Sequence, residues 1–454
     1  MIDWARRAVE SALAAGATDA EGYLSEDRGR EVRVHGGEVE SLSAATKRGI
    51  GVRAWIGARV GYAFDTNLSE AGVDALALRA VEMARAADED EFAGPPRSAV
   101  RLSSDIGGEG AAELSDPSVA SWSTAEIAEL TLAIERTALD ADRRVAGVEQ
   151  AVYADSAERV AIASSTGIEG EYESSHCYGY VLALAEGEGA RETGLGFDLG
   201  RGPVALDPVA IGREGAERAV SMIGARKPQS RAWPVVLDPT VAASFVAIVG
   251  RGLCASAVQR GRSPFAERLG SEVAAGAFVL DDDGLDPEGS ASSPFDGEGV
   301  ARRRTPLIEG GLLRNYLHDT YTASRAGTAS TGSAGRGGYR SQPAVGASNL
   351  LVAPGTLTPE GLLDEAGEGV LVTDVAGLHS GVNPVTGAFS VGASGRAIRD
   401  GELAEPIREF TIASDLVSML GAVSAVGAAP RWVPFGGSVS TPALLIEQMT
   451  VAGS

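Results

Sequence analysis

The sequence predicts a multi-domain α+β protein with mainly antiparallel sheets and flanking helices. Three observations support this prediction. The chain has 454 residues, which is more than a single hydrophobic core usually serves. Paired glycines separate runs of alternating polar and apolar residues, a pattern that is typical of β-hairpins. Helical segments stand before and after these groups of strands, as in an α+β fold.

We assign residues 1–93 to a first domain with the order helix, four-strand meander, helix. An amphipathic segment over residues 3–15 predicts the first helix. Two hairpins are expected to turn at Gly36–Gly37 and near Gly57–Ala58, because glycine readily adopts the positive φ of a tight turn. The second helix is expected to begin after Ser69, whose side chain suits an N-cap.

Residues 118–226 are expected to form a central α+β domain. The preceding stretch, Gly94–Pro117, is rich in Gly, Pro, Ser and Asp and is interpreted as a linker. Ser123 and Glu126 have the spacing of a capping box, which predicts a helix up to about residue 142. Strands are expected at 147–154, 158–164 and 170–186, and a helix at 207–225.

Residues 231–454 are assigned to a C-terminal domain of many short strands joined by glycine turns. A strand should enter a helix near Asp238, and a hairpin should turn at Gly310–Gly311. Extended segments are expected at 367–376, 397–401, 409–412 and 443–451, with a helix at 416–421.

The charge balance argues against a nucleic-acid partner. The chain has 62 acidic and 39 basic side chains and a net charge of −23, so it repels a phosphate backbone. The densest basic run is Arg302–Arg304, which we interpret as a solvated turn beside a strand.

The composition indicates a cytoplasmic protein. Cys177 and Cys254 are the only cysteines, which argues against a disulfide framework. The longest apolar runs, residues 245–249 and 443–446, are too short to span a bilayer, so no membrane association is expected. The N-terminal segment resembles an amphipathic helix and not a signal peptide.

The glycine-rich stretch Gly377–Gly395 has the composition of an active-site loop. It contains His379 and Ser390, eleven positions apart, but it lacks the GxSxG pattern of a nucleophile elbow. This separation does not establish a catalytic pair, and we favour the interpretation that Ser390 is a turn or strand hydroxyl and His379 a backbone-bonded loop residue. Glycines this dense also allow close backbone approach, as in the binding of an extended peptide.

The histidines do not indicate a metal site. A helical metallopeptidase motif places two histidines one turn apart with a glutamate between them. No two of the four histidines have that spacing. They are His35, His176, His318 and His379.

Three stretches together resemble the TldD/PmbA (modulator of DNA gyrase) family. HGGEVESLSAATKRGIGVRAWIGARVGYAFD, residues 35–65, is similar to the family's N-terminal domain. The C-terminal domain is matched by residues 295–338, which begin FDGEGVARRR, and by residues 377–416, which begin GLHSGVNPVTGAF. Within the latter, NPVTGAFSVGASG is closer to the PmbA/TldE branch than to TldD.

The resemblance implies a heterodimeric zinc peptidase that degrades or processes unfolded peptides. In that family TldD carries zinc on a HExxxH helix, with a cysteine near the C-terminus. The matching positions here, about Val246–Arg251 and near Val426, contain no His, Glu or Cys, and Cys254 lies at neither position. The resemblance therefore implies a non-catalytic TldE-type subunit with no cofactor of its own. Zinc is expected in a TldD-like partner, while this chain binds substrate and closes a chamber.

The motif and its glycine context suggest which residues line that chamber. The candidates for substrate binding are Asn383, Thr386, Phe389, Ser390 and His379. The alternative is that they only form turns. An alternative function also stays open, in which the 377–395 loop serves a stand-alone, metal-independent hydrolase or a homodimeric peptide-binding protein. A homodimer is compatible with either function.

Overall fold

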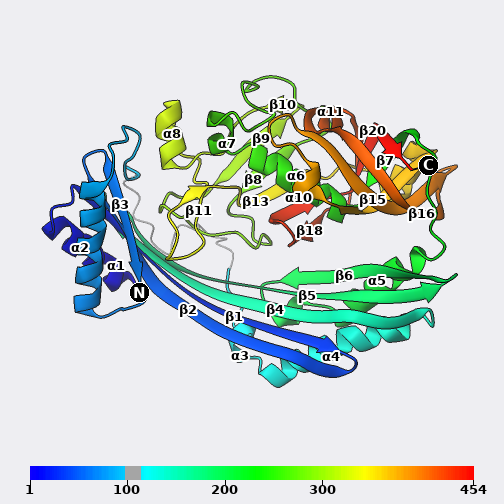
Figure 1. Ribbon diagram of the computed structural model, residues 1–454, viewed down its shortest axis with the longest axis horizontal. Coiled ribbons are helices and arrows are strands. Elements are labelled where there is room, and N and C mark those ends of the chain that lie inside the picture. The colour runs from blue at the N-terminus through cyan, green and yellow to red at the C-terminus, as the bar shows by residue number, and fades with distance from the viewer. Residues whose placement is uncertain (98–113, 454) are drawn as a thin grey trace.

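The computed structural model describes residues 1–97 and 114–453 (Figure 1). This part of the chain contains three six-stranded sheets and one two-stranded sheet, with helices packed against them. Among the pairs of named strands only β7–β14 and β13–β19 are parallel, so the prediction of a mainly antiparallel α+β fold is confirmed. Most of the predicted linker, residues 98–113, lies outside the described residues.

The first sheet contains strands from both the first and the second predicted domain. Its order is β3-β2-β1-β4-β5-β6, and its two central strands pair antiparallel from Glu21↔Ser164 to Val34↔Ala151. The boundary between residues 1–93 and 118–226 therefore divides one continuous sheet, and it remains a prediction. The strands are β1 (Asp19–His35), β2 (Glu38–Ile56), β3 (Arg59–Asp65), β4 (Val145–Ser164), β5 (Glu169–Gly187) and β6 (Ala190–Gly200).

The predicted four-strand meander is wrong, because the structure has three strands in its place, two of them long. β2 continues through Gly49 and Gly51, since β1 pairs with it along its whole length. The two strands expected at 147–154 and 158–164 are likewise one strand, β4, held by neighbours on both sides. Polar residues and glycines do not end a strand when a neighbouring strand continues to pair with it. β6 was not predicted.

The hairpin between β1 and β2 turns at the predicted glycines. Gly36 and Gly37 have φ of 65° and 78°, the left-handed values that glycine adopts without steric cost. Their N–H groups donate to the carboxylate of Glu135 in α4 at 2.7 and 2.8 Å. This contact fixes the tip of the hairpin against a helix more than 90 residues away in sequence.

Four long helices cover the first sheet in two pairs (Figure 1). Ser69 and Ser123 are the predicted N-caps of two of them: the Ser69 hydroxyl accepts from Gly72 N–H, and Ser123 and Glu126 form the predicted capping box. The first pair is α1 (Ile2–Ala14) and α2 (Glu70–Ala86), and the second is α4 (Thr124–Ala141) and α5 (Pro208–Ser221). Two short segments, α3 (Ser118–Ser121) and a 3-10 turn at Pro203–Ala205, complete this unit.

The C-terminal unit contains a small barrel. β16 pairs with both β15 and β20, so the order β16-β15-β14-β7-β20 closes on itself, and β17 extends it beside β20. The segments expected at 397–401 and 409–412 are parts of longer strands in this barrel. The strands are β7 (Arg231–Leu237), β14 (Gly369–Ala376), β15 (Ala388–Arg399), β16 (Glu402–Asp415), β17 (Val423–Val426) and β20 (Leu444–Ala452).

The C-terminal unit also contains a sheet with the order β10-β9-β8-β13-β19-β18. Both this sheet and the barrel contact α6 (Pro239–Gly252), so the helix is buried between them. The predicted hairpin at Gly310–Gly311 joins β9 to β10. The sheet consists of β8 (Leu280–Asp283), β9 (Arg304–Glu309), β10 (Leu312–Leu313), β13 (Asn349–Val352), β18 (Arg431–Val433) and β19 (Ser438–Thr441). The remaining elements are β11 (Ala334–Gly335), β12 (Ala344–Val345), α7 (Ala255–Gln259), α8 (Thr320–Ala326), α9 (Pro359–Ala366), α10 (Leu378–Gly381) and α11 (Leu416–Gly421).

A buried ion network joins the first sheet to the C-terminal unit. Arg53 in β2 contacts Glu21 in β1 at 2.5 Å and Glu298 of the C-terminal unit at 3.2 Å. Arg336 contacts the other oxygen of Glu21 and lies over the ring of Tyr23. Burial acts to raise the pKa of Glu21, but the two arginines outweigh burial and hold this pKa below its usual value. The two units are therefore held in a fixed relative orientation.

The three consecutive arginines are not a free basic patch. Arg302 is half-buried and donates to Ser293 Oγ at 3.0 Å, and Arg303 donates to the carbonyl of Ser330 at 2.6 Å. Arg304 forms an ion pair with Asp281 at 2.6 Å. The interpretation as a solvated turn is therefore wrong for Arg302, whose guanidinium is part of the fold.

None of the helices in residues 1–97 and 114–453 combines the length and the apolar character needed to cross a membrane.

Candidate functional site

The glycine-rich stretch is a tight loop followed by a strand. β14 ends at Ala376, Gly377 adopts φ 81°, and one turn of helix, α10, leads into a turn that closes at Gly387. β15 begins at Ala388, so the second half of the stretch belongs to the barrel and not to a loop. The strand was missed because its glycines suggested irregular backbone.

Asn383 and Thr386 stabilise this turn with their own side chains. The side-chain oxygen of Asn383 accepts from the N–H groups of Val385 and Thr386 at 2.9 and 3.2 Å, and the Thr386 hydroxyl accepts from Ala388 N–H at 3.2 Å. Both side chains are exposed. The turn is therefore held rigid while these side chains remain open to solvent. Their proposed contact with substrate stays a prediction.

Phe389 and Ser390 point to opposite faces of β15. Phe389 is only 4% exposed and its ring lies 4.9 Å from that of Phe245 in α6, so it packs in the core of the C-terminal unit. An exposed position on the chamber surface is thus wrong for Phe389, because alternation along a strand buries every second side chain. Ser390 is exposed, and so is His379 in α10.

No catalytic set is assembled around Ser390 and His379 in the described part of the chain. Neither side chain makes a hydrogen bond to another described residue, and no carboxylate orients the imidazole. A serine nucleophile requires a base within hydrogen-bond reach and an orienting group behind it. The structure places these two residues near one turn but does not join them.

α6 has no metal ligands over residues 246–251, where the sequence resemblance leads us to expect a zinc motif. Val246 and Val249 are 1% and 0% exposed within the core, and Ala247 is also buried. Gly250 lies so close to Leu350 that an added Cβ would approach the leucine methyl to 2.4 Å. Zinc requires imidazole, thiolate or carboxylate donors, and these apolar side chains provide none, so the residues present do not fit the metal.

The two cysteines are buried and their thiols are protonated at neutral pH. Burial raises the pKa of both the Cys177 and the Cys254 thiols to about 12, with a smaller contribution from nearby aspartates. Across residues 1–97 and 114–453, no three His, Cys, Asp or Glu side chains lie close enough to hold an ion.

An aromatic pocket that the sequence analysis missed lies between β6 and β18. Its volume is about 450 Å³, and Phe197, Leu199 and Trp432 contribute to its walls. Phe435, 37% exposed, lies beside it with its ring 5.2 Å from that of Phe197. Since aromatic residues make up only 5% of the chain, their concentration near Pro434 was the available signal. Such a pocket can accept apolar side chains of a ligand.

Arg431 fixes one wall of the aromatic pocket. Its guanidinium forms an ion pair with Glu214 of α5, donates to the carbonyl of Phe197 at 2.8 Å, and stacks 3.9 Å from the centre of that ring. The N–H of Phe197 in turn donates to Glu214 at 3.3 Å. These bonds occupy the outer edge of β6 at Phe197, so a peptide cannot extend the sheet there.

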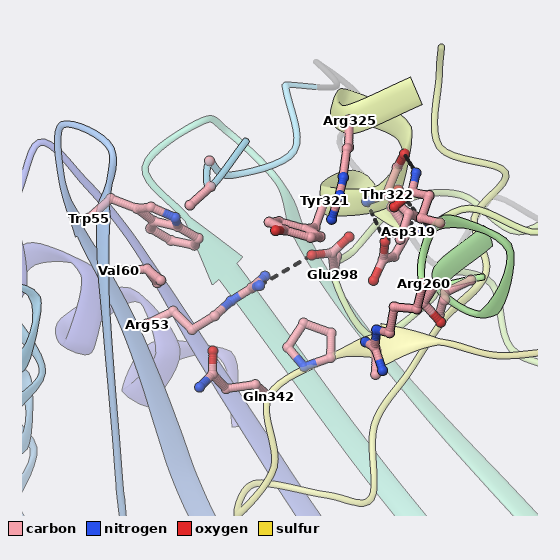
Figure 2. Close-up of a pocket in the computed structure, with 17 residues that line it drawn as sticks. Arg53, Trp55, Val60, Arg260, Glu298, Asp319, Tyr321, Thr322, Arg325 and Gln342 are labelled. Carbon is pink, nitrogen blue, oxygen red and sulfur yellow. Dashed lines mark hydrogen bonds and ion pairs between the residues drawn. The ribbon is translucent and has the colours of Figure 1, made fainter. Parts of the chain in front are cut away.

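A second pocket of about 240 Å³ lies at the junction between the first sheet and α7 and α8 (Figure 2). Arg53 and Trp55 line it from β2, and Glu298 and Tyr321 line it from the C-terminal unit. Arg260 adds a guanidinium that forms no ion pair with any carboxylate in the described residues. This junction pocket therefore offers polar groups of both charges to a ligand.

Known proteins resemble this chain along nearly its whole length. PmbA/TldA metallopeptidase domain 1, the central domain and the C-terminal domain match residues 20–84, 117–223 and 230–453, respectively. The metalloprotease PmbA homolog of Haemophilus influenzae is 29% identical over 98% of this chain and 95% of its own length. Metalloprotease PmbA of Escherichia coli O157:H7 is 28% identical over 97% and 94%.

Solved structures share the fold. TldE from Thermococcus kodakarensis superimposes with a TM-score of 0.90 at 22% identity, covering 99% of this chain and 100% of that one. A Thermotoga maritima protein named as a modulator of a DNA gyrase gives 0.88 at 25% identity, with 99% of both chains covered. The resemblance inferred from the motifs is confirmed, and because three domain models of one family match in order from residue 20 to residue 453, the chain belongs to the PmbA/TldD metallopeptidase family.

Proposed function

We propose that this chain is the non-catalytic, TldE-type subunit of a cytoplasmic heterodimeric zinc peptidase that acts on unfolded peptides. The observation that supports this proposal most strongly is that α6 lacks metal-binding side chains. Positions that bear the family's metal motif hold buried apolar side chains here, and Arg251 stands where a histidine is expected. In this proposal the zinc and the catalytic glutamate belong to a TldD-like partner.

The contribution of this chain would be to bind substrate and close the chamber. The aromatic pocket supplies apolar surface for side chains of an unfolded peptide, beside charged groups such as Asp198 and Glu288. The turn at Asn383 and Thr386 exposes polar side chains elsewhere on the C-terminal unit. In the junction pocket, Arg260 has no ion-pair partner among the residues that the structure describes, and it is suited to a peptide carboxylate. These features favour peptide binding without requiring chemistry in this chain.

The test compares the chain alone with the chain co-expressed with a homologue that carries HExxxH. We expect stoichiometric zinc and chelator-sensitive cleavage of an unstructured peptide only in the mixed sample, with both proteins co-eluting. A partner whose motif glutamate is changed to glutamine is the matched control and should co-elute without activity. Chelator-insensitive cleavage by the chain alone would contradict the proposal.

Two variants separate substrate binding from catalysis in the mixed complex. Trp432→Ala should raise KM several-fold and leave kcat nearly unchanged, because it removes binding surface and no reacting group. Ser390→Ala should change neither constant by more than about twofold. If Ser390→Ala abolished cleavage, the stand-alone hydrolase hypothesis would replace this one.

A further inference from the structure

A cavity of about 250 Å³, which we call the inner cavity, lies between the first sheet and the C-terminal unit. Tyr23, Glu158 and Tyr172 line it from the sheet. Arg302 and Arg336 line it from the C-terminal unit. A cavity of about 150 Å³ accepts benzene, so the inner cavity has room for a molecule of about ten non-hydrogen atoms.

The sheet side of the inner cavity carries a carboxyl group without a counter-charge. Glu158 in β4 is half-buried, and it forms no ion pair or hydrogen bond with any residue in 1–97 and 114–453. Burial, with a smaller contribution from Asp27, raises the pKa of Glu158 to about 7, as expected for a carboxyl that no cation stabilises. A cationic group bound in the cavity would therefore gain a charge partner.

The second carboxyl group of the inner cavity is already occupied. Asp296 is 2% exposed, and its oxygens accept from three backbone N–H groups at 2.9 to 3.0 Å. These bonds fix the surrounding loop of the C-terminal unit. Asp296 thus belongs to the fold, and Glu158 is the carboxyl group that is open to a ligand.

The other side of the inner cavity carries two guanidinium groups with unused donors. Arg336 is 1% exposed, and its Nη2 contacts Glu21, whereas its Nε and Nη1 have no hydrogen-bond partner among the described residues. Arg302 donates from Nε to Ser293 and from Nη1 to the carbonyl of Gly332, and no bond in the described part of the chain involves its Nη2. Buried donors without partners are costly, and carboxylate oxygens suit them best.

The carboxyl group and the guanidinium groups share the cavity without pairing. No ion pair joins Glu158 to Arg302 or Arg336. Burial raises the pKa of Tyr23 and of Tyr172, and Glu158 adds to the rise at both rings. Arg336 opposes this rise at Tyr23, and Arg302 opposes it at Tyr172. Each ring thus lies near both signs of charge, so a ligand that contacts the rings can reach both.

From these observations we infer that the inner cavity binds a free α-amino acid with an apolar side chain. Its ammonium group pairs with Glu158, its carboxylate accepts from the open donors of Arg302 and Arg336, and its side chain packs on the rings of Tyr23 and Tyr172. An α-amino acid carries both charges on one carbon, which suits a cavity of this size. A phosphate or a dicarboxylate would instead be repelled by Glu158.

This inference does not depend on the proposed peptidase role. Binding is measured on the full-length chain alone, without a partner and without cleavage, so either proposal can fail while the other holds.

Titration calorimetry with three related probes tests the two charges. At pH 8, L-leucine should bind with a Kd below about 1 mM. N-acetyl-leucine lacks the ammonium group and leucinamide lacks the carboxylate. Each should bind at least about tenfold more weakly than leucine, because each leaves one charged side of the cavity without its partner.

Glu158→Gln tests the location. This variant should weaken leucine binding by at least about tenfold but should not weaken binding of N-acetyl-leucine, which has no ammonium group to lose. A variant that failed to fold would lose both probes, so the comparison separates a binding role from a structural one. Glu173→Gln is the matched control, because its side chain is 58% exposed on the neighbouring strand, and it should bind all three probes like the wild type.

Three results would overturn the inference. The first is no binding of leucine to the wild-type chain up to about 10 mM. The second is a Glu158→Gln chain that binds leucine as tightly as the wild type. The third is N-acetyl-leucine binding as tightly as leucine, which would make the cavity a general carboxylate site and the assignment to α-amino acids wrong.

Discussion

Within the described residues, two groups of ion pairs that join the first sheet and its helices to the C-terminal unit differ in burial. In the inner junction, formed by Glu21, Arg53, Glu298 and Arg336, no side chain is more than 8% exposed. In the outer junction, Arg431 pairs with Glu214 and Arg408 with Glu192, and both arginines are about one-third exposed. Arginine–glutamate ion pairs thus occur in both junctions, but they are shielded from solvent in the inner junction and partly exposed to solvent in the outer junction.

The difference predicts different roles. Charges in the inner junction have lost their hydration, so each depends on its partners, and removing one leaves the others uncompensated. Charges in the outer junction are 11–35% exposed and keep part of their hydration, so we expect their net effect on stability to be smaller. The ion pair between Arg431 and Glu214 still positions Arg431 against Phe197 and so shapes the aromatic pocket. We therefore expect the inner junction to determine stability and the outer junction to determine geometry.

Breaking the inner junction should have the largest effect. Glu21→Gln keeps the side-chain volume but removes the carboxylate that Arg53 and Arg336 share. We expect the free energy of unfolding, measured with urea, to fall by about 3–5 kcal/mol. Glu31→Gln is the matched control, because its pair with Arg33 is half-exposed, and it should change stability by less than about 0.5 kcal/mol. A loss below about 1 kcal/mol for Glu21→Gln would show that the inner junction does not determine stability.

A half-buried carboxylate beside the inner junction, that of Glu158, should make stability depend on pH. This residue lines a cavity of about 250 Å³ together with Tyr23, Tyr172 and Arg336. Burial, with a smaller contribution from Asp27, raises the pKa of Glu158 to about 7. The unfolded chain releases this proton near pH 4.3, so the contribution to stability is complete below that pH and is lost as the pH rises to about 7.

Glu158→Gln should therefore flatten the pH profile of the unfolding free energy. Between pH 5 and 8 we expect the wild type to lose on the order of 1–3 kcal/mol more than the variant. Burial lowers the pKa of His176, which acts in the opposite direction, so the difference between the two proteins is the quantity to measure. Glu173→Gln on the neighbouring strand, with a side chain 58% exposed, should keep the wild-type slope. If the unfolding free energies of the wild type and Glu158→Gln changed in parallel with pH, Glu158 would not be a source of the pH dependence.

Local patterns were sufficient to predict much of the fold. The Gly36–Gly37 turn and the caps at Ser69 and Ser123 depend on residues a few positions apart, and all three were correct. Pairings between distant segments could not be read in this way. The contact of β1 with β4, and the closure of the barrel by β16 and β20, are decided by packing over more than 30 residues of separation.

The candidate site was predictable only in part for the same reason. The absence of ligands on α6 can be read directly from the sequence, whereas the burial of Phe389 depends on Phe245 in another element. The inner junction combines residues from Glu21 to Arg336, and in the sequence each resembles an ordinary surface charge. Its function as a buried network becomes visible only when the sheet and the C-terminal unit are placed together.

The smallest loss of stability is expected from a variant in the outer junction. A measurement in high salt distinguishes this loss from the loss in the inner junction. Glu214→Gln should reduce the free energy of unfolding by no more than about 1 kcal/mol, because its pair with Arg431 is partly hydrated. In about 1 M NaCl the Debye length falls to about 3 Å, so this difference should nearly vanish. The loss caused by Glu21→Gln should persist in the same salt, since ions do not screen a buried pair. If both losses responded alike to salt, the inner and outer junctions would be energetically equivalent, and burial could not be the property that separates stability from geometry.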